Sequence, residues 1–327
     1  MILLRPIAKK FGLVDKPNSR KIHHGDIPYI GGLCIFINLL FSQIYLNEPI
    51  VVVNLILITS FLILIIGTCD DILNLKAKTK LFFQILLIFI TIILVDIKIE
   101  NIGYFPILSS LKLGYLAIPL TVIGICGFIN ATNMIDGSDG VAGSLMIVAI
   151  TGILLKSFPL EEYMFFDILL SLTSALIPFL FFNIFGSTNY KIFLGDGGSL
   201  FLGFIVVFIL VYNSQNIDGF TATYALWCVA IIIFDFFSVI ILRKIERRSL
   251  HIATNDHIHH LLGNLGLSKK IILIIIVSFG VAFLYVGYFL ESNFKVFSFP
   301  FFIMLFIIYF YSRSLLISYN NNLSQKL

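Results

Sequence analysis

The sequence predicts an all-α fold, a polytopic membrane helix bundle of about ten transmembrane helices. Hydrophobic residues make up 59% of the 327 residues and charged residues 12%, which is about half the charged share of an ordinary soluble domain. The mean hydropathy of +1.02 agrees with this composition. Apolar runs long enough to cross the ~30 Å hydrocarbon core recur along the chain, and runs of this length are not typical of barrel strands. Helices are the remaining structure that can span the membrane, because they satisfy their own backbone hydrogen bonds in lipid.

Ten apolar runs are the candidate transmembrane helices. They cover residues 29–46, 50–68, 81–97, 115–129, 140–156, 163–182, 199–212, 222–241, 271–290 and 297–312. The runs 115–129 and 199–212 are short, and we expect their ends to extend into the neighbouring polar segments. No soluble domain of useful size stands between the runs, so we expect residues 1–327 to form a single integral-membrane domain.

The positions of Lys and Arg predict the orientation of these spans. Counting spans divides the connecting segments into two sets that face opposite sides of the membrane. The set that holds 18 of the 22 Lys and Arg residues comprises 1–28, 69–80, 130–139, 183–198, 242–270 and the tail from 313. The other set holds only Lys98, Lys112, Lys156 and Lys295. Because positively charged loops stay on the cytoplasmic side, we expect the first set to be cytoplasmic.

Four polar motifs lie in this cytoplasmic set, each beside an apolar run. Carboxylates are expensive near hydrocarbon, so motifs that converge there predict a functional site. Acidic residues at a membrane surface further suggest a divalent cation that holds phosphates. The motif residues are Asp70, Asp71 and Lys80; Asn130, Asn133, Asp136 and Asp139; Phe193 and Asp196; and His257, His259 and His260.

The first motif pairs two carboxylates. Asp70 and Asp71 repel each other when both are charged, and a bound Mg²⁺ or another cation relieves that repulsion. Lys80 follows after a short turn as a counter-charge or a phosphate contact. The structural alternative is a solvated acidic loop, with flanking lysines that end the helix.

The second and third motifs combine amides, carboxylates and glycines. The Asn and Asp residues of 130–140 recur every three positions, so a helical turn would place them near one face. They suit a sugar hydroxyl, a uracil edge or a metal-bound water, or they simply cap a helix. The glycines beside Asp196 leave backbone N–H groups exposed near a helix N-terminus, and such groups bind anions. Because the Asp196 carboxylate would repel an anion there, a cation would have to lie between the two. A capped glycine turn is the alternative.

The histidine motif follows a basic stretch. Neutral imidazoles at His257, His259 and His260 could ligate zinc, but only Asp256 stands nearby to complete a tetrahedral set. We therefore favour hydrogen bonds to phosphates. The preceding Arg and Lys residues are typical of a positive-inside anchor, and they also attract a phosphorylated lipid or a nucleotide.

In their order and spacing, the motifs resemble one family, the polyprenyl-phosphate N-acetylhexosamine-1-phosphate transferases of glycosyltransferase family 4, the WecA, TagO and MraY type. Residues 15–32 are similar to the family's first cytoplasmic segment, and residues 70–80 to its aspartate pair with a trailing lysine. Residues 130–140 are similar to its Asn-x-x-Asn-x-x-Asp-Gly-x-Asp-Gly loop, residues 193–199 to its Phe-x-Gly-Asp-x-Gly-Ser loop, and residues 257–260 to its histidine box. The resemblance thus runs through most of the chain.

The resemblance implies a reaction and its partners. A polyprenyl phosphate such as undecaprenyl phosphate attacks the β-phosphorus of a UDP-N-acetylhexosamine, with UDP-GlcNAc as the first choice, and yields polyprenyl-diphospho-sugar and UMP. The step requires Mg²⁺, with Mn²⁺ as an alternative, and it initiates a cell-envelope polysaccharide such as lipopolysaccharide O-antigen. The resemblance implies a multi-pass protein of the inner or plasma membrane, with its active site in cytoplasmic loops. We expect no nucleic-acid partner, and a homodimer is left open.

Residue roles carry over from the resemblance. Asp196 would be the direct metal ligand, and Asp70 and Asp71 would position or deprotonate the lipid phosphate. Phe193 would lie against uracil. The remaining substrate contacts would be Lys80, Asn130, Asn133, Asp136, Asp139, Asn183, His257, His259 and His260.

Three departures from the family pattern affect these expectations. Family members usually carry one more span before the segment 15–32, so we expect a shortened start or a ten-span branch. An Asp followed by Arg or Lys usually precedes the histidine box, where this chain has Thr254 and Asn255, which leaves the sugar open. The usual Pro-Ala after Asn183 is replaced by Phe185, Gly186 and Ser187.

Two other functions fit part of the sequence. A multi-span transporter would carry ions on its acids, but transporters usually place such sites near the midplane within inverted repeats. Here the acids lie at one face, and no repeat is visible. A CDP-alcohol phosphatidyltransferase would share the start of its motif with Asp136-Gly-Ser-Asp139-Gly140, but the later residues of that motif are absent.

Cysteine labelling tests the shared face of the motifs. Single cysteines introduced as Ser138→Cys and Ile258→Cys are expected to react with a membrane-impermeant maleimide from the same side, because span counting puts both in the cytoplasmic set. The measurement compares intact cells with inverted membrane vesicles. Labelling of the two positions from opposite sides contradicts the span count.

Overall fold

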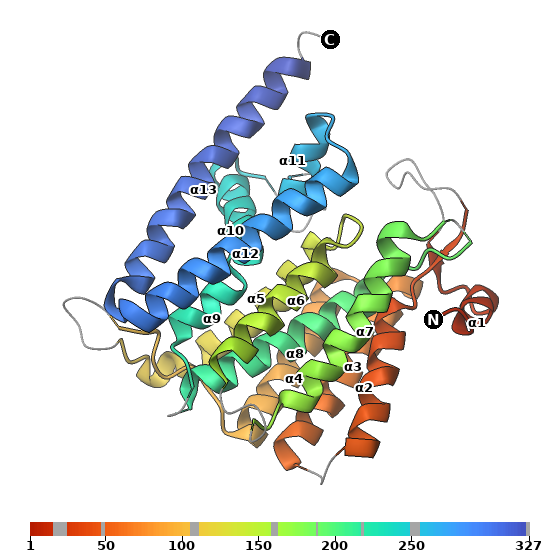
Figure 1. Ribbon diagram of the computed structural model, residues 1–327, viewed down its shortest axis with the longest axis horizontal. Helices are drawn as coiled ribbons and strands as arrows, with labels where there is room; N and C mark the ends of the chain where they lie inside the picture. Colours follow the sequence, from red (N-terminus) through yellow and green to blue (C-terminus); the bar gives the residue numbers. More distant parts are fainter. Residues whose placement is uncertain are drawn as a thin grey trace.

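A computed structural model describes residues 1–15, 25–46, 50–104, 111–157, 163–187, 189–216, 219–248 and 256–324, so Thr254, Asn255 and the part 16–24 of the opening segment lie outside it. The described chain is mostly helical, and the helices pack into one bundle (Figure 1). The helices are α1 (Leu4–Lys10), α2 (Gly31–Leu46), α3 (Val51–Leu73), α4 (Ala77–Val95), α5 (Ala117–Ile135), α6 (Val141–Lys156), α7 (Phe166–Phe185), α8 (Gly195–Gln215), α9 (Ala222–Cys228), α10 (Ala230–Ile245), α11 (Ile258–Asn264), α12 (Lys269–Asn293) and α13 (Lys295–Ser324). A turn of 3-10 helix, η1 (Gly114–Leu116), precedes α5, and the strands β1 (Val14–Asp15) and β2 (Ile27–Pro28) form an antiparallel pair.

The predicted all-α membrane fold is confirmed, and each of the ten apolar runs coincides with a helix or a helix pair. In the described ranges, seven helices are long and apolar enough to cross a membrane: α3, α4, α5 with η1, α7, α8, α12 and α13. The run 222–241 forms a bent pair, α9 and α10, with an angle of 86° between them. The helices α2 and α6 are apolar but shorter. The number of ten spans therefore stays a prediction.

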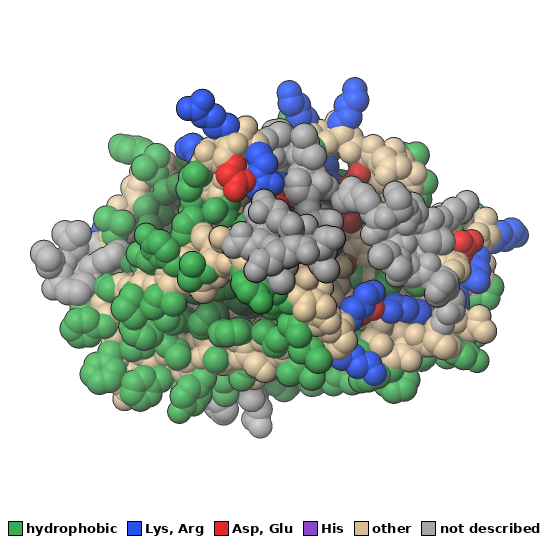
Figure 2. Space-filling model, turned by 90° about the horizontal axis from the view of Figure 1, so that it is seen from above, with side chains coloured by type: hydrophobic (Ala, Val, Ile, Leu, Met, Phe, Trp, Pro, Cys, Tyr) green, Lys and Arg blue, Asp and Glu red, His purple; other side chains and the backbone are tan. Residues whose placement is uncertain are grey.

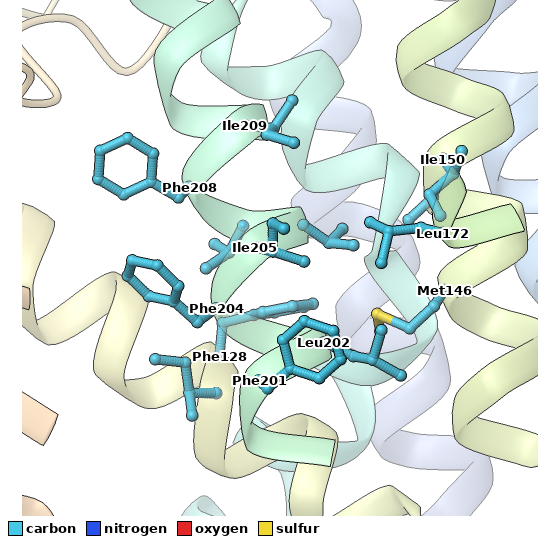
Figure 3. Close-up of a cluster of buried hydrophobic side chains, with 14 of the residues drawn as sticks. Phe128, Met146, Ile150, Leu172, Phe201, Leu202, Phe204, Ile205, Phe208 and Ile209 are labelled. Carbon is cyan, nitrogen blue, oxygen red and sulfur yellow. The ribbon is translucent and has the colours of Figure 1, made fainter. Parts of the chain in front are cut away.

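Helix α8 is the centre of the bundle. In its most apolar 18-residue stretch 83% is buried, compared with 11 to 44% for the other candidate spans. Its side chains pack in several directions: Phe204 and Phe208 lie on one side, while Leu202 faces Met146 and Leu172 on the other (Figure 3). A helix that is buried all round is apolar all round, which explains why the run 200–211 has no polar stripe.

Two glycine contacts bring α8 against its neighbours at its N-terminal end. A Cβ at Gly67 of α3 would stand 2.4 Å from the Cα of Gly197, and a Cβ at Gly32 of α2 would stand 2.2 Å from the Cα of Gly198. These distances leave no room for a side chain, so the backbones of the three helices are in direct contact. This close approach brings the polar ends of α3 and α8 together.

The structure corrects the limit of one predicted polar segment, at the end of α3, and confirms that the short runs 115–129 and 199–212 extend into their polar neighbours. α3 continues to Leu73, so Asp70 and Asp71 lie in its last two turns rather than in a loop. α5 continues to Ile135, and α8 already begins at Gly195. Polar groups at these ends bond to one another across helices, so the helices continue through residues that hydropathy alone assigns to loops. The predicted loop site is therefore built mainly from helix ends.

The surface has the character of a membrane protein. Hydrophobic side chains cover much of the face in Figure 2, whereas Lys and Arg project mainly from its upper margin and at the right. Exposed large apolar side chains are most frequent on α4 and α13. A soluble protein rarely leaves such continuous apolar surfaces uncovered, whereas lipid chains cover them in a multi-pass membrane protein.

Candidate active site

Helix ends from α3, α4, α5 and α8 meet around the ammonium group of Lys80. Lys80 Nζ, in the first turn of α4, lies 2.7 Å from Asp70 Oδ2 of α3 and 3.2 Å from Asp196 Oδ2 of α8. Asn133 of α5 donates from Nδ2 to Asp196 Oδ1 at 2.9 Å and to Ser199 Oγ at 2.9 Å. Residues of three motifs therefore lie in one polar group, which we call the Lys80 cluster.

The adjacent carboxylates of Asp70 and Asp71 have different partners. Asp70 pairs with Lys80. Asp71 accepts hydrogen bonds from the backbone N–H of Asp196 at 3.1 Å and from that of Gly197 at 3.4 Å. An acceptor at this place satisfies free N–H groups and the positive dipole end of α8. Asp71 therefore connects the end of α3 to the start of α8.

The Lys80 cluster contains more carboxyl groups than cationic groups. Asp70 and Asp196 contact the Lys80 ammonium group, Asp71 lies beside them against the first turn of α8, and the charges of Asp196 and Asp71 also reach Asp136. Among the described residues, no three His, Cys, Asp or Glu side chains are arranged to hold a metal ion. Mg²⁺ is usually bound by only one or two carboxylates, with substrate phosphates and waters in its remaining positions. The donor set therefore fits Mg²⁺, because two carboxylates already converge on a cation.

Asp136 directly follows the last residue of α5. Burial, together with the negative charges of Asp196, Asp71 and Asp139, raises the pKa of Asp136 well above its usual value. These surroundings favour the neutral carboxyl group, which both donates and accepts a hydrogen bond. Such a group suits a polar ligand, because it adds no negative charge beside the Lys80 cluster.

Asn130 lies one turn before Asn133 and has a different partner. Its Nδ2 donates to Gln84 Oε1 of α4 at 2.8 Å and to the backbone carbonyl of Cys126 at 2.8 Å. Gln84 is completely buried, so this pair ties α5 to α4 inside the bundle. Asn130 and Asn133 also line an apolar groove between α4, α5 and α10.

Asp139 and Asn183 hold the turn between α5 and α6 in place. Asp139 Oδ2 lies 2.7 Å from Lys191 Nζ and 3.3 Å from Lys269 Nζ. Asn183, near the end of α7, accepts a hydrogen bond from the backbone N–H of Gly140 at 2.6 Å and donates to a backbone carbonyl before α8 at 2.8 Å. Both the oxygen and the nitrogen of this buried amide therefore form hydrogen bonds within the protein. The substrate contacts predicted for Asn183 and Asp139 stay predictions.

Phe193 stands in the extended segment before α8. Its backbone N–H donates to the Pro28 carbonyl, and its own carbonyl accepts from the Gly31 N–H. The Phe193 ring lies beside Tyr29, with 6.4 Å between ring centroids, and the Lys191 Nζ lies 5.8 Å from the Phe193 ring centroid. A ring beside a cation suits a flat base that carries phosphates, and the contact with uracil stays a prediction.

The histidine motif packs against the turn between α5 and α6. A Cβ at Gly137 would stand 2.3 Å from the imidazole Nε2 of His259, so the ring lies directly on this glycine. Burial and the neighbouring His260 lower the pKa of His259 to about 3, and the ring is neutral. Neither of its nitrogens has a hydrogen-bond partner among the described residues. Because buried polar atoms normally have partners, these nitrogens are candidates for a ligand contact.

The residues that hold His257 are absent from the sequence prediction. His257 Nδ1 lies 2.6 Å from Asp235 Oδ2 of α10, and Asp235 Oδ1 lies 2.7 Å from a guanidinium nitrogen of Arg313 in α13. Gln84 and Lys191 are likewise unpredicted. Asp235 is the only charged residue in the apolar run 222–241, and this is the signal that could have found it.

The fold and the site define a multi-pass membrane protein whose acidic, lysine-balanced site at helix ends suits phosphate-bearing substrates. Residues 53–214 match the model of the family described as "Glycosyl transferase family 4". The chain belongs to this family and is a transferase, so the resemblance drawn from the motifs is confirmed.

Three relatives show how far the similarity extends. The "Probable undecaprenyl-phosphate N-acetylglucosaminyl 1-phosphate transferase" of Bacillus subtilis (strain 168) is 32% identical over 286 residues, which cover 86% of this chain and 78% of the relative. The undecaprenyl-phosphate alpha-N-acetylglucosaminyl 1-phosphate transferase of Yersinia pestis is 30% identical over 277 residues, and that of Escherichia coli (strain K12) is 29% identical over 279 residues. Both alignments cover 83% of this chain and 74% of the relative.

Asp136→Asn tests the neutral carboxyl group. Folding raises the pKa of Asp136, so this residue lowers the free energy of unfolding as the pH rises above its unfolded pKa of about 4. The variant lacks this cost, so it should unfold at a temperature higher by roughly 2 °C or more at pH 7 to 8, with the gain vanishing toward pH 4. Thermal unfolding in detergent with EDTA measures the difference.

Asp139→Asn is the matched control for this measurement. This variant loses the ion pairs with Lys191 and Lys269, so it should unfold at a lower temperature than the wild type at pH 7. A gain for Asp136→Asn that is independent of pH, or a loss like that of the control, contradicts the raised pKa of Asp136.

Proposed function

We propose that the protein transfers N-acetylglucosamine 1-phosphate from UDP-GlcNAc to undecaprenyl phosphate. A phosphate oxygen of the lipid attacks the β-phosphorus of UDP-GlcNAc, the bond from that phosphorus to the bridging oxygen breaks, and UMP leaves with the electron pair. The products are undecaprenyl-diphospho-GlcNAc and UMP, and the lipid product would start a cell-envelope polysaccharide. Family membership and the names of relatives at 29 to 32% identity support this reaction.

The observation that carries the proposal is an apolar groove that ends at the Lys80 cluster. The groove has a volume of about 710 Å³ and lies between α4, α5 and α10. Away from the cluster it is lined by apolar side chains such as Phe89 and Ile118. At the cluster its lining includes Lys80, Asn133 and Arg243.

This groove has the two-part chemistry of a lipid phosphate. Between Ile118 and Asn133, α5 rises by about 22 Å, which is more than half of the ~30 Å hydrocarbon core. The isoprenoid chain would therefore be shielded from water along most of its bound length. Its phosphate would meet Lys80 and Arg243 at the polar end, where charge-assisted hydrogen bonds are strong.

The Lys80 cluster would align the two anionic substrates. Asp70, the partner of Lys80, would align or deprotonate the lipid phosphate, and Asp71 would act indirectly by holding the first turn of α8. Asp196 would hold Mg²⁺, with Mn²⁺ as an alternative, and the bound ion would neutralise charge on phosphate oxygens. Phosphoryl transfer depends mostly on such neutralisation and on alignment.

The nucleotide sugar would bind beside the turn between α5 and α6. The neutral carboxyl group of Asp136 and the unused nitrogens of His259 offer hydrogen bonds without added charge. Phe193 offers a ring for the base, and Lys191 near that ring offers positive charge for a phosphate. These groups adjoin the Lys80 cluster through Asp136, so one bound UDP-sugar could reach both.

We further propose that the site faces the cytoplasm at the inner or plasma membrane. The concentration of 18 of the 22 Lys and Arg residues in the segments that carry the motifs supports this orientation. We also propose that residues 1–327 act as one integral-membrane domain. Its assembly, as a monomer or a homodimer, is measurable by mass photometry in nanodiscs.

Release of UMP is the direct test of the proposed reaction. Purified protein with UDP-GlcNAc, undecaprenyl phosphate and Mg²⁺ is expected to release UMP, and EDTA is expected to stop the release. Asp196→Asn and Asp70→Asn should each abolish turnover, because each removes a charge that the alignment of phosphates needs. UDP-GalNAc and UDP-6-deoxy-sugars in the same assay identify the preferred sugar.

Two results would contradict this scheme. Folded wild-type protein that releases no UMP from any UDP-N-acetylhexosamine rules out the reaction. Full turnover in Asp196→Asn or in Asp70→Asn removes that residue from the site.

A bulky side chain in the groove tests the lipid site. Gly127 lines the groove, whereas a Cβ at Gly124, on the same helix, would meet open space. Gly127→Leu should raise the KM for undecaprenyl phosphate by roughly ten-fold, equal to about 1.4 kcal/mol, and leave the KM for UDP-GlcNAc unchanged. Gly124→Leu is the matched control and should behave as the wild type. Equal effects of the two variants contradict a lipid site in the groove.

A further inference from the structure

A second cluster of buried polar side chains joins α10 and α13 to the histidine motif. Asp235 and Arg313 are each 1% exposed, and His257 is 6% exposed. Arg313 Nη1 donates to Asp235 Oδ1 at 2.7 Å and to Ser238 Oγ at 2.7 Å, while Nη2 donates to the backbone carbonyl of Asp256. The other carboxylate oxygen, Asp235 Oδ2, lies 2.6 Å from His257 Nδ1.

Stability alone does not explain this cluster. Removing two charges from water costs several kcal/mol per ion, and well-packed apolar residues of similar size often serve stability equally well. The contacts instead converge on one short stretch of chain. Arg313 binds the carbonyl of Asp256, and Asp235 accepts from the backbone N–H of Ile258 at 2.9 Å, so the backbone is held on both sides of His257.

The cluster also decides which nitrogen of His257 can meet a ligand. Because the Asp235 carboxylate can only accept, Nδ1 donates to it, which leaves Nε2 for an external partner. The His257 ring lies parallel to that of His259, with a 6° angle and 6.0 Å between centroids. His259 in turn packs on Gly137. The orientation of the His257 ring is therefore tied to the turn beside the Lys80 cluster.

We propose that Asp235 and Arg313 are positioning residues for the transfer reaction. They hold His257 in one orientation with Nδ1–H directed at Asp235, so that in the doubly protonated ring Nε2–H donates to a phosphate oxygen of the UDP-sugar. Negative charge that builds up on that oxygen during transfer is stabilised by the imidazolium, which Asp235 stabilises in turn. This inference rests on the proposed function and adds a specific role for two residues from distant helices.

A double-mutant cycle tests the proposal. Asp235→Asn keeps the side-chain size and removes the charge, so kcat for UMP release should fall about ten-fold to a hundred-fold. The KM for undecaprenyl phosphate should not change, because the groove contains none of the three residues. His257→Ala should reduce kcat at least as much. Adding Asp235→Asn to His257→Ala should change kcat by less than about two-fold, because Asp235 acts only through His257.

Two further variants keep the test independent of folding defects. Arg313→Lys keeps the positive charge but loses the planar fork that joins Asp235 to the Asp256 carbonyl, so it should lower kcat in the same way by a smaller factor. Glu291→Gln is the matched control, because Glu291 is a buried carboxylate, 2% exposed, that accepts from the Thr221 backbone and hydroxyl away from the site. Its kcat per folded protein should stay within about two-fold of the wild type.

Three outcomes overturn the positioning role. The first is wild-type kcat in both Asp235→Asn and Arg313→Lys. The second is a further loss in the His257→Ala background as large as that in the wild-type background. The third is an equal loss in Glu291→Gln. If the wild-type protein itself releases no UMP, the proposed function fails as well, whereas an active wild type with an additive cycle removes this inference alone.

Discussion

Negative charge gathered at one end of a membrane bundle needs compensation, and the geometry of this site depends on how Lys80 supplies it. The ammonium group joins the end of α3 to the start of α8, and Asp71 and Asn133 complete the connection through the first turn of α8. This first turn can approach α3 only because Gly67 and Gly197 bring the two backbones into contact. Since α8 is the most buried helix of the bundle, the core holds the position of its polar N-terminus.

The excess of carboxyl groups is explained if the site binds two anionic substrates together with a cation. Carboxylates repel phosphates, so Asp70 and Asp196 at one lysine, with Asp71 beside them, would hinder a reaction between phosphates unless a further cation entered. The groove approaches the Lys80 cluster from the hydrocarbon side, and Asp136 and His259 adjoin the turn between α5 and α6. A lipid phosphate and a water-soluble nucleotide sugar would thus meet at the boundary that separates their solvents.

The cluster of Asp235, Arg313 and His257 follows similar physical rules. Both clusters contain charges that hydropathy would exclude from buried positions, and in both each charge has a specific partner. The second cluster also attaches helix α13 to the bundle. Only 11% of its apolar stretch is buried, and Arg313 and the aromatic contacts of Phe302 with Trp227 and Phe234 join it to α9 and α10.

The sequence by itself determined the all-α membrane class and the positions of the apolar runs, because solvation by lipid depends on local composition and not on packing. The order of the motifs was also sufficient to predict the family. Only the tertiary structure decided that Asp71 bonds to the backbone of α8, that the amide of Asn183 is used within the protein, and that Asp235 pairs with Arg313. The last two residues are 78 positions apart. Such pairs form because helix packing brings distant side chains together where water cannot satisfy them, and no local pattern encodes that geometry.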